Sequence, residues 1–268
     1  MELKIPNDPT RIDKYQFIEP ICKGSMSSIC KYLHKEKKEF VAIKQSRGKY
    51  SKHGQCEIDI LKSIEYPNII KYIESFAIDG VIHLVLEYTP SIDLYDFSQK
   101  TKYIEANNLI FIMYQLLLTV EYLHSKNICH NDIKLENILL ISNTDYCIKL
   151  IDFGLSHIIK DDESVKQFQG TLYYIPPEQI RKKYNKKKDI WCCGCVLYNL
   201  ISDDYPFYNK NHRRITHHIL NEIWTVHPDN LNYDDKRIIH LIKIMMTYNP
   251  HERLNAADLL TLDIFYDE

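Results

Sequence analysis

The sequence predicts an α+β fold in two lobes, a small antiparallel β lobe with one key helix and a larger, mainly α-helical lobe. Residues 15–47 alternate apolar and polar positions between turn breaks, as the strands of a small antiparallel sheet do. From Ala106 onward, apolar residues instead recur every three or four positions, which is typical of helices. The chain has 268 residues, which is enough for two lobes with cores of their own.

The composition is that of an ordinary soluble globular protein, with 45% hydrophobic and 26% charged residues. The net charge of −2 argues against a nucleic-acid-binding protein, which would carry a large basic excess. The longest apolar stretch, from Leu109 to Val120, is too short to span a bilayer, and the N-terminus lacks the apolar region of a signal peptide. Three of the eight cysteines cluster at 192–195 and are expected to be buried helix thiols. We therefore expect no membrane association and an intracellular location, cytoplasmic or nuclear.

The small lobe contains a candidate ion pair. Residues 41–44 (Val-Ala-Ile-Lys) form a predicted strand that would bury Lys44, and a buried ammonium needs a carboxylate partner. The partner that we nominate is Glu57, in a predicted helix from Gln55 to Ile64. The alternative is an ordinary ion pair between two solvated surface charges.

The larger lobe is expected to be organised around residues 128–152. Two apolar runs, 138–141 and 148–151, are predicted to be short buried strands joined by a polar turn at 142–145. If they pair as a hairpin, the segments that flank its open end come together, with Asp132, Lys134 and Asn137 on one side and Asp152 on the other. Carboxylate and amide oxygens suit Mg²⁺, and the remaining acid and ammonium suit phosphoryl transfer. The preceding segment, 106–125, is predicted to be a core helix.

The same residues carry a resemblance to a known family. His130-Asn131-Asp132-Ile133-Lys134-x-x-Asn137 followed by Asp152-Phe153-Gly154 resembles the catalytic loop and metal-binding loop of eukaryotic protein kinases. The resemblance implies a protein kinase fold over residues 15–265, with a small lobe at 15–89, a large lobe at 90–265 and an N-terminal extension at 1–14.

The resemblance implies a role for each candidate site residue. Asp132 would accept or orient the proton of the attacking hydroxyl, Lys134 would neutralise the transferred phosphoryl group, and Asn137 and Asp152 would hold Mg²⁺. Lys44, held by Glu57, would bind the phosphates of ATP. The glycine-rich loop is degenerate, because Gly24 is its only glycine. The remaining implied ATP contacts are Ile21, Gly24, Ile29, Ala42, Leu86, Glu87, Thr89, Asp93 and Leu139.

Further implied roles are structural. Asp189 would hold the backbone of the catalytic loop, Glu178 would pair with Arg253, and His130 would pack on Phe153. Thr171 would bridge Asp132 and Lys134 through its hydroxyl group.

Lys134 and the Gly170-Thr171 pair are similar to those of serine/threonine kinases, and the surrounding motifs look most like calcium/calmodulin-dependent and calcium-dependent protein kinases. The sequence has no Asp-x-Asp-x-x-Gly loop, so we expect no calcium-binding module in cis. The expected partners are ATP and protein substrates with Ser or Thr acceptors. We expect a preference for basic sequence contexts through Glu136 and Asp93. We also expect activity without phosphorylation of the chain, because Asn131 stands where the family usually has arginine.

Two alternatives remain open from the sequence. A pseudokinase that acts as an allosteric or scaffolding partner is favoured by the degenerate glycine loop and Asn131. A small-molecule kinase on the same scaffold is disfavoured by the peptide-platform motif from Gly170 to Glu178.

Overall fold

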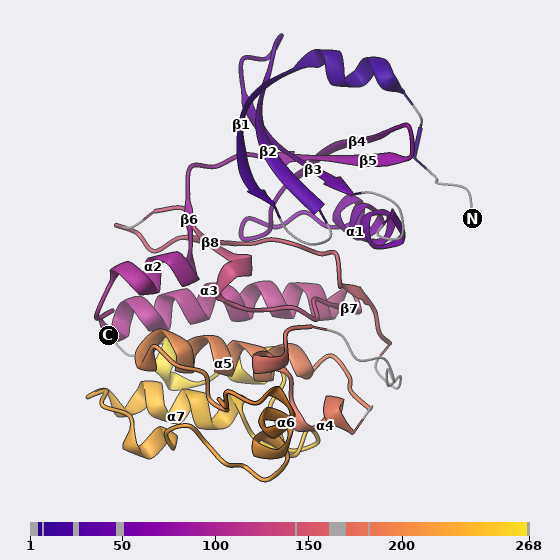
Figure 1. Cartoon of the computed structure of the whole chain (residues 1–268). Coiled ribbons are helices and arrows are strands. Elements are labelled where there is room, and N and C mark those ends of the chain that lie inside the picture. The colour runs from indigo at the N-terminus through magenta and orange to yellow at the C-terminus, as the bar shows by residue number, and fades with distance from the viewer. Residues whose placement is uncertain are drawn as a thin grey trace. The chain divides into compact units, whose positions relative to one another are not determined.

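The computed structural model describes residues 5–6, 8–23, 27–46, 51–142, 144–160, 170–181 and 183–266, without the side chains of residues 51–53. The chain divides into two compact units, Met1–Pro90 and Ser91–Glu268. Figure 1 traces the elements of each unit.

Unit 1 is built on a five-stranded antiparallel sheet with the order β1-β2-β3-β5-β4. Its core contains Ile43, Phe76 and Val85, which are fully buried on neighbouring strands. The strands are β1 (Tyr15–Lys23), β2 (Ser27–His34), β3 (Phe40–Ser46), β4 (Tyr72–Ile78) and β5 (Val81–Glu87).

One helix, α1 (Ser51–Ser63), contacts β4 and β5 of this sheet. It buries Ile58 and Leu61, the apolar stripe that the sequence pattern marks. The helix begins four residues before the predicted start at Gln55, because its first turn, Ser-Lys-His-Gly, contains no apolar residue that would reveal the periodicity.

The segment before β1 is attached to the sheet of unit 1. The amide of Asp8 donates to the Ala77 carbonyl (3.0 Å), and the Ala77 amide donates to the Pro6 carbonyl (3.0 Å). A 3₁₀ helix, Pro9–Lys14, follows and is capped by the Asp8 side chain. Within the predicted extension at 1–14, the described residues Pro6 and Asp8 therefore bond to the edge strand β4.

Unit 2 is mainly helical. The long central helix α3 contacts α5, α7 and α8, and α5 in turn packs against α7 (Figure 1). Its apolar stripe is buried, as the sequence pattern predicts. The helices are α2 (Leu94–Lys100), α3 (Ala106–Ser125), α4 (Pro177–Ile180), α5 (Lys188–Ser202), α6 (His212–Leu220), α7 (Lys236–Met245) and α8 (Ala256–Leu260).

Unit 2 also contains two small sheets. One has the order β6-β8-β9, formed by Ile92–Asp93, Ile138–Leu140 and Ile148–Leu150; the other pairs β7 (Ile128–Cys129) with β10 (His157–Ile158). A β unit and a mainly helical unit confirm the predicted α+β architecture. In the described part of the chain, no helix has the length and apolar character needed to cross a membrane.

Candidate active site

The hairpin predicted from the two apolar runs is present in unit 2. Strands β8 and β9 pair antiparallel, with Ile138 opposite Leu150. At the open end, the backbone N–H of Ile151 donates to the carbonyl of Asn137 (2.9 Å). The segments before β8 and after β9 are therefore joined at the point where the candidate residues lie.

Asp132 is the centre of a hydrogen-bonded set of side chains. The Asn137 amide nitrogen donates to the carbonyl of Asp132 (2.8 Å) and to its Oδ2 (3.1 Å). The Lys134 ammonium lies 3.0 Å from the same Oδ2, and the Thr171 hydroxyl donates to Oδ1 (2.9 Å). Lys134 also donates to the Thr171 hydroxyl (3.1 Å), so Thr171 bridges the acid and the ammonium as expected.

The residues nominated for Mg²⁺ have suitable donor atoms. The amide nitrogen of Asn137 is bonded to Asp132, so its oxygen is the atom that this side chain can offer to a cation. Asp152 is exposed, directly follows Ile151 and has a left-handed backbone (φ +62°). Its Oδ1 accepts a hydrogen bond from the Gly154 amide (3.3 Å). One carboxylate and one amide oxygen fit Mg²⁺, which takes its other ligands from water and phosphate.

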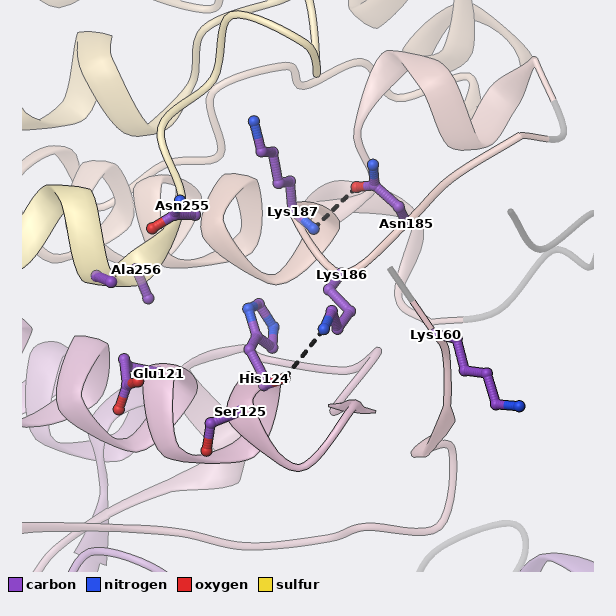
Figure 2. A pocket seen from close by; sticks show the side chains of 10 residues that line it. Glu121, His124, Ser125, Lys160, Asn185, Lys186, Lys187, Asn255 and Ala256 are labelled. Atoms are coloured by element: carbon purple, nitrogen blue, oxygen red, sulfur yellow. Dashed lines mark hydrogen bonds between the residues drawn. The ribbon is translucent and has the colours of Figure 1, made fainter. Parts of the chain in front are cut away.

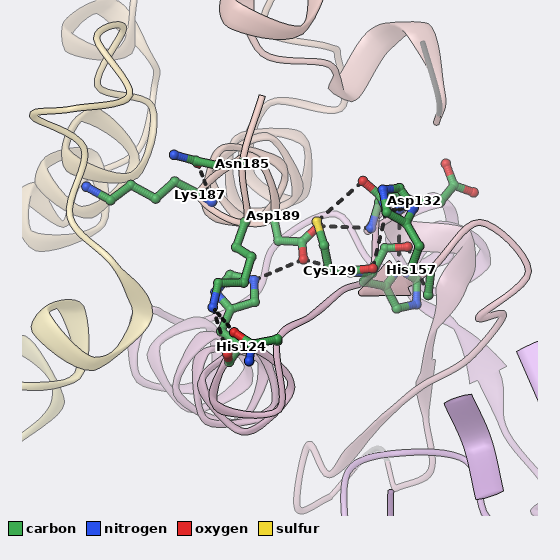
Figure 3. A network of polar contacts seen from close by, with 12 residues as sticks. His124, Cys129, Asp132, His157, Asn185, Lys187 and Asp189 are labelled. Carbon is green, nitrogen blue, oxygen red and sulfur yellow. Dashed lines mark hydrogen bonds and ion pairs between the residues drawn. The ribbon is translucent and has the colours of Figure 1, made fainter. Parts of the chain in front are cut away.

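Asp189, at the start of α5, accepts hydrogen bonds from the backbone of the loop that precedes Asp132 (Figure 3). Its Oδ2 accepts from the His130 amide (2.8 Å), and its Oδ1 accepts from the Asn131 amide (3.0 Å). The imidazole of His124 lies 3.0 Å from Oδ2. Burial alone raises the pKa of Asp189, but the hydrogen bond and charge of His124, together with the hydrogen bond from the His130 amide, outweigh it and lower the pKa to about 2.

His130 is a packing residue of the loop. Its ring meets Phe153 edge to face, with centroids 4.8 Å apart. Its Nε2 lies 3.1 Å from the Ile151 carbonyl, while its Nδ1 accepts from the Asp132 amide (3.3 Å), a pattern that fits the neutral ring. Burial lowers the pKa of His130. The neutral imidazole therefore links the loop before β8 to the end of β9.

Unit 1 contains the predicted lysine–glutamate pair. The Lys44 ammonium lies 2.8 Å from Oε1 of Glu57, and the two residues are 6% and 2% exposed. This burial contradicts the alternative of two solvated surface charges. A pair buried to this degree is costly unless further groups satisfy it, which is consistent with a place for anionic ligand oxygens.

The other nominated nucleotide contacts occupy varied environments. Leu86 is buried, Ile21 is 48% exposed, and Ile29, Ala42, Thr89 and Leu139 are half-buried. Glu87 accepts a hydrogen bond from the Lys71 amide through its side chain (2.8 Å). Asp93 caps α2 by accepting from the Asp96 amide (2.8 Å), and burial raises its pKa. Gly24 lies outside the described residues.

A buried ion pair in unit 2 joins Arg253 to Glu178 in α4. Arg253 is fully buried, and its guanidinium donates to both carboxylate oxygens of Glu178 (2.6 and 3.1 Å). It also donates to the carbonyls of Thr247 (2.9 Å) and Lys187 (3.1 Å) and lies over the Trp191 ring.

The cysteines at 192, 193 and 195 are buried on α5, as expected, and burial raises the pKa of each thiol.

His124 belongs to no motif that would single it out in the sequence; it lies at the end of α3, and its imidazole reaches Asp189. It also lines a cavity of about 350 Å³ together with Lys160, Lys186 and Lys187 (Figure 2). The Lys186 ammonium donates to the His124 carbonyl and to Asn127 Oδ1, both at 3.0 Å. The three lysines that line this cavity point in different directions in Figure 2, so they do not converge on one anion.

Lowering the pH should reveal the contribution of Asp189 to stability. Its pKa is depressed in the folded chain, so its stabilisation is present above the unfolded pKa and is lost as the pH falls from about 5 toward 2. We expect a loss of about 2 kcal/mol over this range from this residue alone. Chemical denaturation of the unaltered chain and of Asp189→Asn at several pH values measures it. The difference in unfolding free energy between them should shrink as the pH falls, and a constant difference would contradict the assignment.

Comparison with known proteins agrees with this geometry. A family model, the protein kinase domain, matches residues 15–265. The chain is 32% identical over 265 residues to a probable myosin light chain kinase of Dictyostelium discoideum, covering 96% of this chain and 55% of that protein. It is 32% identical over 248 residues to calcium-dependent protein kinase 3 of Plasmodium berghei (strain Anka), covering 90% of this chain and 45% of that protein.

A second probable myosin light chain kinase of D. discoideum is 32% identical over 257 residues, covering 93% of this chain and 82% of that protein. The chain belongs to the protein kinase family, and the resemblance to calcium-dependent and related kinases is confirmed. It spans about half the length of the first two of these relatives.

Proposed function

We propose that the chain is a protein kinase that transfers the γ-phosphate of ATP to serine or threonine hydroxyls of proteins. The observation that carries the proposal is a hydrogen-bonded set of side chains formed by Asp132, Lys134, Asn137 and Thr171. Asp152 lies beside this set, because the preceding residue, Ile151, donates its amide N–H to the Asn137 carbonyl. Phosphoryl transfer depends mainly on positioning and on neutralising charge, and this set supplies both.

Each side chain has a role that follows from its contacts. The Asp132 carboxylate accepts hydrogen bonds already, so it is suited to orient a substrate hydroxyl and receive its proton. Lys134 is half-buried beside it and would neutralise charge on the phosphoryl group. Asn137 and Asp152 would hold Mg²⁺, which supplies charge neutralisation at the phosphates when bound.

The nucleotide contacts are proposed from unit 1 and from the start of unit 2. Lys44, oriented by Glu57, would bind ATP phosphates. Residues 86–89, at the end of β5, would read the adenine edge through their backbone. Asp93 is a weaker candidate for the ribose, because its carboxylate already caps α2.

A preference for basic substrates is carried by Glu136 more than by Asp93. Glu136 is half-buried in unit 2, and among the described residues its Oε2 has no hydrogen-bond partner. Its negative charge contributes to raising the pKa of the neighbouring Tyr205 to about 12, after the larger effect of burial. A cationic substrate side chain would complement this carboxylate.

A peptide panel tests the proposal. Peptides with a Ser, Thr or Tyr acceptor, each with Arg or Ala three positions before the acceptor, are incubated with Mg²⁺ and γ-labelled ATP. We expect label on Ser and Thr, and about tenfold faster transfer with Arg, an advantage that Glu136→Gln should largely remove. Label on tyrosine alone would refute the acceptor class, and an Arg advantage unchanged in Glu136→Gln would refute the role of Glu136. Nucleotide binding without transfer to any peptide would favour the pseudokinase.

We also propose that transfer does not require phosphorylation of the chain. The Asn131 amide donates to the Leu155 carbonyl (3.1 Å) and lies 2.9 Å from His157 Nδ1, so it is used inside the loop and carries no charge for a phosphate. Phosphatase treatment before the peptide assay should leave the rate unchanged. The sequence offers Ser164 and Thr171 as candidate phosphorylation acceptors. Ser164 lies outside the described residues, and the Thr171 hydroxyl donates to Asp132 (2.9 Å).

A further inference from the structure

Lys188, the first residue of α5, is a buried cation to which the roles proposed above assign no task. It is 0% exposed, whereas the preceding residues Lys186 and Lys187 are half-buried. Burying an ammonium is costly unless nearby groups compensate its charge. The groups that surround the Lys188 ammonium therefore indicate the role of this residue.

The ammonium of Lys188 lies under two segments of the candidate site. Its Nζ is 4.7 Å from the centroid of the Tyr184 ring, a cation–π distance. A methyl group built on Gly170 would lie 3.4 Å from this Nζ and 2.5 Å from the carbonyl oxygen of Asn131. The Lys188 ammonium and the Asn131 carbonyl oxygen therefore both approach Gly170 closely.

The close approach at Gly170 depends on its missing side chain. Gly170 has φ +99°, which L-residues rarely adopt, and a Cβ would collide with the Asn131 carbonyl. Asn131 also has a left-handed backbone (φ +69°), and its amide N–H is bonded to Asp189. Two unusual backbone conformations are thus held against each other beside the Lys188 ammonium.

The next residue of each segment belongs to the candidate site. Asp132 follows Asn131, Thr171 follows Gly170, and the Thr171 hydroxyl donates to Asp132 Oδ1 (2.9 Å). A cation packed against Gly170, which itself lies against the Asn131 carbonyl, can fix the register of this bond. The other titratable groups around the Lys188 ammonium are His157, Cys129, Cys192 and Asp189. Burial lowers the pKa of His157 and raises the pKa of the Cys129 and Cys192 thiols, so these three groups are neutral.

We propose that Lys188 is a positioning residue of the phosphotransfer site, whose buried ammonium holds Asn131–Asp132 and Gly170–Thr171 together so that Thr171 reaches Asp132. The inference rests on the proposed kinase activity and deepens it. Because the charge is part of the folded interior, the two segments are ordered without a phosphate group. A fully buried ammonium is also out of reach of a phosphorylated side chain.

The test compares Lys188→Met, which keeps length and removes charge, with Lys188→Arg, which keeps charge, and Lys187→Met, a matched control on the neighbouring lysine. We expect Lys188→Met to lower kcat by about 10- to 100-fold with KM for ATP changed less than about twofold. Lys188→Arg should recover at least about a third of the activity, and Lys187→Met should match the unaltered chain. Circular dichroism and thermal melts establish that each variant is folded.

A double-mutant cycle separates positioning from general support of the fold. If Lys188 acts through the Thr171–Asp132 bond, Lys188→Met combined with Thr171→Val should be no slower than Thr171→Val alone. Multiplied losses would overturn the proposal, as would an unchanged kcat in folded Lys188→Met. If Lys188→Met does not fold, Lys188→Gln replaces it in the cycle, and unfolding of both variants would assign Lys188 to the fold and overturn the positioning role. Absence of transfer by the unaltered chain would overturn the kinase proposal and this one together, whereas transfer that is insensitive to Lys188 would overturn this one alone.

Discussion

Replacing Asp132 by asparagine should lower kcat about 10³-fold, within the range known for loss of a general base. Asparagine keeps the shape of the side chain and can still accept the Thr171 hydrogen bond, but it loses the negative charge beside Lys134 and the ability to take a proton. Steady-state phosphotransfer to a serine peptide measures the effect.

Asp145→Asn is the matched control, because Asp145 is an exposed acid in the turn at the opposite end of the same hairpin. It should leave kcat within about twofold of the unaltered chain, since isolated surface substitutions usually have small effects. Equal losses in both variants would show that the hairpin responds to any change of charge and that Asp132 has no special role.

Replacing Arg253 by methionine should have the largest effect on stability. The change leaves Glu178 buried without its cation and removes the donors to the Thr247 and Lys187 carbonyls. Removing one partner of a buried ion pair generally lowers the free energy of unfolding by about 3–5 kcal/mol. Urea denaturation measures the loss.

The double variant Glu178→Gln/Arg253→Met serves as its control. It removes the stranded charge as well, so it should be more stable than Arg253→Met alone. A loss below about 1 kcal/mol in Arg253→Met, or a double variant that is less stable than the single one, would contradict a structural role for the pair.

The fold was largely predictable because its elements have strong local patterns. The α3 stripe and the two hairpin runs are apolar with clear periods, and both elements lie where the sequence predicts them. Strand β4 was not predicted. Its residues, Tyr-Ile-Glu-Ser-Phe-Ala-Ile, include a bulge against β5 between Tyr72 and Glu74, which interrupts the simple alternation.

The candidate site was predictable where a motif fixes several residues at once. Asp132, Lys134, Asn137 and Thr171 meet as expected, because a short hairpin and one loop determine their positions. His124 and Lys188 could not be found in this way. Each is a single polar residue at a helix end, and only the packing of α3 and α5 on the catalytic loop shows what it contacts.

The proposed site is tested most directly by Mg²⁺-dependent transfer of the γ-phosphate of ATP to a basic serine peptide, measured for the purified chain and for Asp152→Ala. We expect steady incorporation by the unaltered chain that rises with Mg²⁺ and saturates, and a loss of at least about 10²-fold in a folded Asp152→Ala variant. Equal incorporation by the two proteins, or none by an unaltered chain that binds ATP, would contradict a phosphotransfer site built from Asp132, Asn137 and Asp152.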